Sequence, residues 1–402
     1  MLEEHLEEWY HGPVSSPEPD TPEFKQFNRL QGDLAIKRFE LLSAHLFHWP
    51  STITRDAPTD ISIDRLRSKK DIHTHFHSSL LPLLKQHFNS VAEVLGDLIE
   101  LRKDPAPRIQ RVLEIQPYLH QTLDQMIRII DDIIPGKVPE PSQTNDQHFE
   151  HFKSYRLFGL DNCIRGELRC RIAGFFYDSC IIIEELKLPA RKRFPSSLGS
   201  QHSLNAAFDT TLKWLNGSEL YIIPDLWEDS IRGNFAAYSQ YFDLLDPPSG
   251  LPMSQAAIQL AQSIFPIIKL AKLFFAKLSR KPVKGKPVPL FTEMSSQQLY
   301  SLHKSSEEYG ESMMDLVFHL EEADLHPHTS LSLIRDIQVL STHFQSYVPL
   351  AALYIAPLSP DIDGVSAQIY FKTWFITWNT LFFTATENAI QAANVFAQNH
   401  DI

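Results

Sequence analysis

Glycine is scarce in this sequence, and the short glycine motifs of several enzyme classes are missing. The 402 residues include 14 glycines against 26 phenylalanines. No GxGxxG or GxxxxGK(S/T) loop is present for nucleotide phosphates, and no GxSxG turn for an esterase nucleophile. The composition disfavours a turn-rich all-β fold or a glycine-loop α/β fold. It does not exclude a site assembled from residues distant in sequence.

Cysteine is scarcer still, and no CxxC pair is present for zinc or redox chemistry. Cys163, Cys170 and Cys180 fall within one predicted helix, where positions seven apart are roughly 10 Å apart, beyond disulfide reach. We predict a reduced protein with these thiols as small core residues, and a raised pKa for Cys180 in its apolar run. A reactive thiol at Cys163 or Cys170 is the alternative, because three nearby arginines favour a lowered pKa: Arg165, Arg169 and Arg171.

Long apolar runs are absent too. No uncharged apolar run reaches the roughly 18 residues of a membrane span, and the longest candidate, 347–358, contains two prolines. The first residues, MLEEHLEEWYHG, have neither the basic start nor the apolar stretch of a signal peptide. These features predict no transmembrane segment and an intracellular location, in the cytoplasm and/or the nucleus.

What the sequence does have is helical periodicity along nearly its whole length, with no convincing strand runs. We therefore predict an all-α fold. The expected helices cover 22–47, 71–101, 107–134, 145–187, 201–216, 219–245, 254–280, 295–324, 328–356 and 365–399. Ser295 with Gln298 predicts a capping box, and Asn216-Gly217-Ser218 predicts a helix stop followed by a helix start.

A chain of this length favours about two domains. The segment DPPSGLP at 246–252 is the predicted boundary, because its prolines and glycine do not continue a helix. We expect a disordered acidic tail at 1–21, an N-terminal helical bundle at 22–246 and a C-terminal four-helix bundle at 253–400. Short connections between long helices predict mostly up-and-down antiparallel neighbours.

Aromatic residues crowd the run YFKTWFITWNTLFFTATENAI at 370–390. At 100° per residue most of these rings share one helix face, and we predict that this face fills a core rather than binding a ligand or a membrane. Its central residues are Phe371, Phe375, Trp378 and Phe382. Ile376 and Phe383 fall off this face, and we expect them to touch a second neighbour.

Charge is unevenly placed along a chain whose formal net charge is −12. Residues 1–24 hold seven acids and no Lys or Arg, whereas residues 254–290 hold seven basic residues and no acid. This basic segment consists of Lys269, Lys272, Lys277, Arg280, Lys281, Lys284 and Lys286. It is a candidate site for an anionic partner such as nucleic acid, acidic lipid or an acidic protein segment, including the chain's own tail. The alternative is a helix C-terminus that favours cations, followed by a solvated loop.

Two histidine pairs are candidate metal ligands. His73 and His77 share a helix face, and His148 and His151 stand three positions apart beside Asp146 and Glu150. Each pair needs further ligands from elsewhere, and the alternative is that these histidines only titrate beside nearby acids. No cofactor is predicted.

The acidic pair Asp131-Asp132 resembles the magnesium-diphosphate motif of helical prenyl-chain enzymes, but the further acid of that motif is missing. Ile133, Ile134 and Pro135 follow instead. We expect a solvated acidic helix end.

Four runs, KWLNGSELYIIPDLW (213–227), IFPIIKLAKLFFAKLS (264–279), PLFTEMSSQQL (289–299) and YFKTWFITWN (370–379), resemble a lineage-expanded set of uncharacterised proteins of rust fungi (Pucciniales). The resemblance implies a shared helical fold and a plant-pathogenic basidiomycete source, and it transfers no activity. The two-bundle arrangement is also similar to that of the cyclin-D1-binding protein family, which consists of all-helical intracellular regulators.

Three functions remain open at this point. The first is a non-catalytic interaction or scaffold protein that offers helix surfaces to an unknown protein partner. The second is a regulator that binds an anionic partner through the basic segment. The third is an enzyme with a convergent metal-dependent site. The sequence names no partner and does not determine the oligomeric state.

Overall fold

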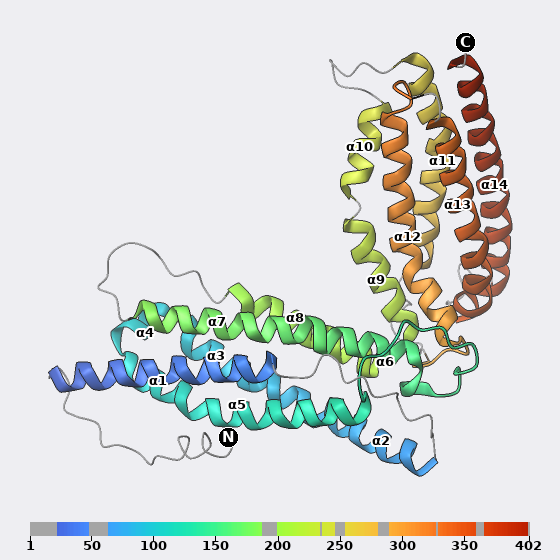
Figure 1. Cartoon of the computed structure of the whole chain (residues 1–402). Coiled ribbons are helices and arrows are strands. Elements are labelled where there is room, and N and C mark those ends of the chain that lie inside the picture. Colours follow the sequence, from blue (N-terminus) through green and yellow to red (C-terminus); the bar gives the residue numbers. More distant parts are fainter. Residues whose placement is uncertain are drawn as a thin grey trace. The chain divides into compact units, whose positions relative to one another are not determined.

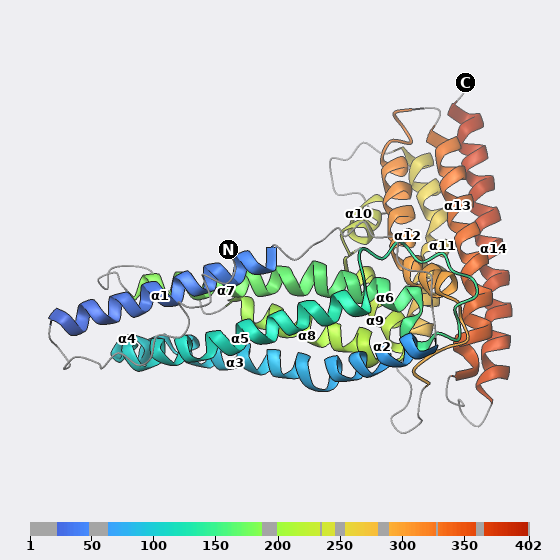
Figure 2. The same cartoon turned by 60° about the horizontal axis from the view of Figure 1, so that its bottom comes forward.

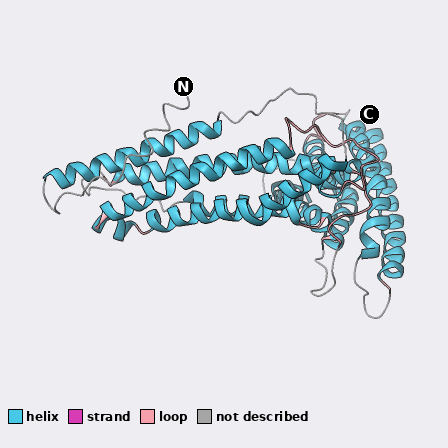
Figure 3. Cartoon of the chain, turned by 90° about the horizontal axis from the view of Figure 1, so that it is seen from below, coloured by secondary structure: helices cyan, strands magenta, loops and turns pink. Residues whose placement is uncertain are grey.

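The computed structural model describes residues 22–47, 63–186, 199–233, 235–245, 254–279, 289–326, 329–358 and 366–400. All regular structure in these ranges is helical, and no residue within them forms a strand (Figure 3). The predicted all-α fold is confirmed. The predicted acidic tail at 1–21 lies outside the described residues, and so does the segment 246–252.

The chain divides into two compact units. Unit 1 comprises Met1–Glu140 and Arg156–Asn216, and unit 2 comprises Pro141–Tyr155 and Gly217–Ile402. This division differs from the predicted boundary at 246–252, because the helices of residues 219–245 pack on helices of unit 2. A proline- and glycine-rich sequence marks where helices end, but it does not determine which neighbours they pack on.

Unit 1 is a ring of five long helices, in which α1 contacts α7, α7 contacts α8, α8 contacts α3, α3 contacts α5, and α5 contacts α1 (Figures 1 and 2). The predicted helix over 71–101 is interrupted by a π-helical turn and by a break at Asp97. The elements are α1 (Pro22–Phe47), α2 (Ile63–His75), η2 (Phe76–Leu80), α3 (Leu81–Gly96), α4 (Leu98–Lys103), α5 (Pro105–Ile133), α6 (Ser154–Asp161), η4 (Asn162–Leu168), α7 (Arg169–Glu185) and α8 (Gly199–Asn216), and the first two residues of α6 belong to unit 2.

Phenylalanine rings fill the centre of unit 1. Phe39 stacks on Phe176 with ring centroids 5.5 Å apart, joining α1 to α7. Phe88 of α3 meets Phe175 edge-on at 5.2 Å and contacts Phe208 of α8 at 5.9 Å. Burying each such ring stabilises the fold by about 2–3 kcal/mol relative to leaving it exposed.

Unit 2 is built on a four-helix bundle in which α11, α12, α13 and α14 contact one another around a ring and run in alternating directions (Figure 1). The predicted up-and-down bundle is confirmed. Helices α9 and α10 pack along its side, on α11 and α12. The elements are η3 (Glu150–Phe152), α9 (Glu219–Gly233), α10 (Phe235–Leu245), α11 (Gln255–Leu278), α12 (Ser296–Glu321), α13 (Thr329–Leu350), η5 (Ala351–Ile355), η6 (Ala356–Leu358) and α14 (Ala367–His400).

The aromatic face of α14 lies in the core of this bundle, as predicted. Trp378 stacks on Phe382 with ring centroids 4.7 Å apart, and its indole N–H donates to the carbonyl of Leu270 at 2.8 Å. Phe274 of α11 lies 5.1 Å from the Trp378 ring, and Phe344 of α13 lies 4.9 Å from Phe382. This hydrogen bond gives the indole N–H, the one polar group of the Trp378 side chain, an acceptor in place of water.

Among the described helices, α11 is long and apolar enough to cross a membrane, by length and composition only. In the bundle it is a core helix, since Ile264, Ile268 and Phe275 are all buried against neighbouring helices. Lysines at 269 and 272 interrupt its apolar surface. Its composition follows from its central position in unit 2.

Residues 141–155, here called the crossing segment, supply hydrogen bonds to the N-terminus of α12. Four backbone N–H groups at a helix start lack intrahelical acceptors. Ser296 N–H donates to Asp146 Oδ1 at 2.8 Å, and Gln297 N–H donates to the carbonyl of Gln143 at 3.0 Å. The predicted capping box of Ser295 and Gln298 satisfies the remaining positions and is confirmed.

Candidate functional site

The basic segment is only partly described, since residues 280–288 lie outside the described ranges. Lys269 and Lys272 are exposed on α11, and the Lys269 ammonium lies 4.6 Å from the centre of the Phe265 ring. Lys277 is held by α14: its ammonium donates to the Tyr370 hydroxyl at 2.5 Å and lies 4.4 Å from the centre of that ring. Lys277 therefore helps to join α11 and α14.

The predicted pair His73 and His77 does share one face, at the junction of α2 and η2. The ring centroids are 5.6 Å apart, and His77 Nδ1 lies 3.1 Å from the carbonyl oxygen of His73. His73 is buried and His77 is half-buried. No third histidine, cysteine or carboxylate ligand joins them among the residues that the structure describes.

The second predicted pair does not share a helix, because the expected helix over 145–187 begins only at Ser154. His148 is exposed and lies against Phe149, and His151 meets the Phe291 ring edge-on at 4.8 Å. Asp146 binds the start of α12 and is buried. Local helical spacing therefore did not predict the geometry of this pair.

Asp132 is exposed, as expected for a solvated acidic helix end, whereas Asp131 is 30% exposed and is paired with Arg165. Arg165 donates to Asp131 at 2.9 Å and to Asp161 at 2.6 Å, and also to the carbonyls of Ile134 and Gly136, both at 2.8 Å. Gly136 has a φ of 104°, which L side chains rarely adopt. Arg165 thereby fixes the end of α5 and the turn that follows it.

The cysteines within the described residues are free. Burial raises the pKa of the Cys163 thiol to about 12, and Glu167 adds to the shift, so the alternative of a pKa lowered by arginines does not hold for Cys163. Cys170 is exposed, so the prediction that it is a small core residue is wrong. Burial likewise raises the pKa of Cys180 to about 12, as predicted. Arginines close in sequence did not lower the pKa of Cys163, because the thiol is taken out of water.

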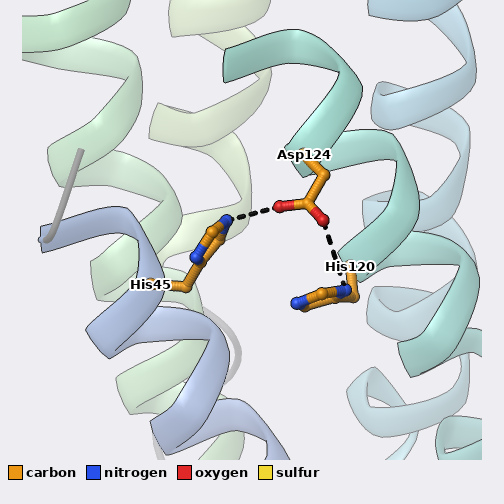
Figure 4. Close-up of side chains that lie close together, drawn as sticks. All are labelled: His45, His120 and Asp124. Carbon is orange, nitrogen blue, oxygen red and sulfur yellow. Dashed lines mark ion pairs between the residues drawn. The ribbon is translucent and has the colours of Figure 1, made fainter. Parts of the chain in front are cut away.

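A cluster that the sequence analysis missed joins α1 to α5. His45 Nε2 lies 2.6 Å from Asp124 Oδ1, and His120 Nδ1 lies 3.8 Å from Asp124 Oδ2 (Figure 4). The two imidazole centroids are 5.4 Å apart. The side chains of His45, Asp124 and His120 are 33, 30 and 27% exposed, so the cluster is accessible to water yet partly enclosed.

The protonation of this cluster follows from its contacts. The short contact with His45 is the largest cause that lowers the pKa of Asp124; burial opposes this shift, and the charges of His120 and Arg128 lower the pKa further. Burial lowers the pKa of His120, opposed by the charge of Asp124. The spacing of His120 and Asp124, four apart on α5, was visible in the sequence. His45 was not predictable as their neighbour, because it lies 75 residues before His120 on another helix.

The outer face of α14 carries apolar side chains that its own bundle does not cover. Ile369 and Ile376 are 62 and 61% exposed, and Phe383, one further heptad along, is half-buried. The expected second neighbour for Ile376 is therefore not found among the described residues. Thr373 and Thr380 lie between them, also exposed, with each hydroxyl donating to the carbonyl four residues earlier. We call these five residues the outer stripe of α14.

The fold and these sites define an all-α protein of two helical units. Two family models match it, and the first of them also spans residues 141–155, which belong to unit 2. Residues 69–216 match a domain of unknown function (DUF8723), and residues 218–391 match another domain of unknown function (DUF8721). Their limits agree with the division between the units at Asn216 and Gly217. No curated protein and no solved structure matches the chain. The resemblances to rust-fungal proteins and to the cyclin-D1-binding protein family stay predictions.

Proposed function

We propose that this is a non-catalytic interaction protein of the cell interior, in the cytoplasm and/or the nucleus, which binds an amphipathic helix of a protein partner on the outer stripe of α14. The observation that carries the proposal is the exposure of Ile369 and Ile376 at a seven-residue spacing. Isolated exposed apolar residues are ordinary on protein surfaces, whereas a repeat along one helix face is typical of helix recognition.

The spacing of the outer stripe fits a helix as its occupant. Its members follow one another at steps of four and three residues, which is the heptad spacing of a coiled-coil seam. From Ile369 to Phe383 the stripe is roughly 21 Å long at 1.5 Å per residue, about two heptads of a partner. A straight helix drifts about 20° per heptad relative to such a repeat, so the three heptad positions 369, 376 and 383 span about 40° of the helix face.

The low charge of this surface also favours the apolar face of an amphipathic helix as its partner. Lys372 is the one charged residue between 368 and 386. A seam with so little charge has a small desolvation cost when it is covered. An acidic or basic peptide gains little from such a surface.

The experiment places a photocrosslinking residue at Ile376 in the full-length chain, expressed in its native cell. We expect a specific adduct whose crosslinked peptide maps to an amphipathic helix of another protein. The same residue at Val395, which is 50% exposed on the same helix but off the stripe, is the matched control and should not give this adduct. A crosslink to a second copy of this chain identifies self-association instead and contradicts the proposal.

Charge substitutions give a second readout. Ile376→Glu should abolish binding of the partner so identified, whereas Val395→Glu should leave it unchanged, and both variants should keep the wild-type helical content. Binding that survives Ile376→Glu with unchanged affinity rejects the outer stripe as the binding surface. Regulation of an anionic partner and metal-dependent catalysis remain rival functions.

A further inference from the structure

We propose that His45, His120 and Asp124 bind a divalent transition-metal ion of the zinc class. The three side chains come from α1 and α5, two helices that contact each other in unit 1. One donor atom from each lies within 4.8 Å of the others, and the three groups point toward a common space (Figure 4). This is a different site from the histidine pairs predicted from the sequence, and it is independent of the outer stripe of α14.

The distances suit an ion after small side-chain movements. Zinc lies about 2.0–2.1 Å from imidazole nitrogen and about 2.0–2.2 Å from carboxylate oxygen, so ligand atoms around one ion are about 3–3.5 Å apart. The two separations from Asp124, 2.6 Å to His45 and 3.8 Å to His120, lie on either side of that range. The ligand atoms all lie within 4.8 Å of one another, so binding one ion requires the side-chain ends to move by about 1 Å.

The donor set selects the kind of ion. Two imidazole nitrogens and one carboxylate oxygen suit zinc, cobalt, nickel or ferrous iron. Magnesium and calcium prefer all-oxygen ligand sets, so we expect neither to bind here. With three protein ligands and about a third of each side chain exposed, a water molecule or an added ligand can occupy the remaining coordination position.

The rival explanation is that Asp124 bridges two histidines as an ion-pair network and has no affinity for metals. Arg128, one turn along α5, is close enough to lower the pKa of Asp124. Its positive charge opposes a bound cation and therefore offers a test. If a metal binds at this site, Arg128→Gln should tighten binding, whereas the rival explanation gives no metal affinity to tighten.

The test is a calorimetric titration of the full-length chain with zinc, after a chelator has removed any bound metal. We expect one high-affinity site per chain, also occupied by cobalt but not by calcium or magnesium. His120→Gln and Asp124→Asn should each weaken zinc binding at least about 100-fold, since even loss of an outer-sphere partner costs about 10–100-fold. Arg128→Gln should strengthen it.

A double variant, His73→Gln with His77→Gln, is the matched control for a chain rich in histidine, and it should keep the wild-type affinity. Circular dichroism establishes that each variant is folded. Failure of the wild-type chain to bind zinc stoichiometrically, equal binding in the His120→Gln variant, or loss of binding in the control each overturns the proposal. None of these results affects the outer stripe of α14, which lies in unit 2 and is tested by crosslinking.

Discussion

Lys153 and Glu219 form a fully buried ion pair in unit 2, with the ammonium nitrogen 3.0 Å from the carboxylate oxygen and neither side chain exposed to solvent. Lys153 also donates to the carbonyl of Thr292 at 2.7 Å, while the backbone N–H and hydroxyl of Thr292 both donate to Glu219 at 2.7 Å. Charges that are removed from water require such partners. The pair joins the crossing segment to the start of α9 and to the loop before α12.

Breaking this pair should destabilise unit 2 strongly. Lys153→Met leaves the Glu219 carboxylate buried without its cation, and we expect a loss of about 3–5 kcal/mol in the free energy of unfolding, measured by urea denaturation. The double variant Lys153→Met with Glu219→Gln should recover part of the loss, because a neutral amide oxygen still accepts from Thr292. No recovery in the double variant contradicts this explanation.

The crossing segment should be required for unit 2 to fold. A fragment of residues 217–402 lacks Lys153 and the Asp146 carboxylate that binds the start of α12, so we expect low helicity and no cooperative unfolding transition by circular dichroism. Adding a peptide of residues 141–155 should restore both. A peptide with Asp146→Asn and Lys153→Met should not, and a fragment that folds cooperatively alone refutes the requirement.

Gly159 of unit 1 should not tolerate a side chain. A Cβ atom there would lie 2.2 Å from Cζ3 of the Trp214 ring. We expect Gly159→Ala to cost about 1–3 kcal/mol of unfolding free energy through overpacking. The matched control is Gly174→Ala in α7, where nothing lies within 4 Å of an added Cβ, and it should instead stabilise by about 0.5–1 kcal/mol. Equal effects at the two positions contradict the packing argument.

His303 should make unit 2 less stable in mild acid. Burial lowers its pKa from 6.5 to about 4, aided by Lys304 and opposed by Glu307. Below pH 6.5 the unfolded chain binds a proton that the folded chain refuses until about pH 4, so stability falls as pH decreases across this window, by up to about 1.4 kcal/mol per pH unit. His303→Phe should remove this slope in pH-dependent denaturation, and His148→Gln, at an exposed histidine, should not.

The basic segment predicts salt-sensitive binding to nucleic acid or to vesicles containing acidic lipid. The triple variant Lys281→Glu, Lys284→Glu and Lys286→Glu should abolish that binding in a sedimentation or mobility-shift assay. The control is the same Lys→Glu change at three exposed lysines elsewhere, and it should retain most of the binding. These lysines are Lys37, Lys70 and Lys103. If the wild type does not bind, or if the two triple variants bind equally, the hypothesis that the basic segment binds an anionic partner is wrong.

Local features of this chain were largely predictable. Periodicity predicted α1 and the four bundle helices α11–α14 to within a few residues where the helices are regular. The apolar residues of each helix recur at helical steps. The capping box of Ser295 and Gln298 was visible because both partners lie within one turn. The π turns at Phe76–Leu80 and Asn162–Leu168 were not predicted, since no propensity in these sequences marks the extra residue in the turn.

The candidate metal site shows where such reasoning stops. His120 and Asp124 stand four residues apart on α5, so a correct prediction of the helix already places them on one face. His45 reaches them only because α1 packs against α5 in the five-helix ring. The same limit applies to Cys163, because burial determines its pKa, while Arg165 contacts Asp131 and Asp161 and Arg171 contacts Glu167.

The sequence by itself determined that the chain is helical, where most helices begin and end, and which aromatic face of α14 is buried, because each of these depends on residues within a few turns of one another. Only the tertiary structure decided that residues 141–155 belong with unit 2, that Lys153 meets Glu219, and that His45 meets Asp124. Lys153 and Glu219 are 66 positions apart, and His45 and Asp124 are 79 positions apart. The free energy of these contacts comes from burial and charge pairing, which a local sequence pattern does not predict.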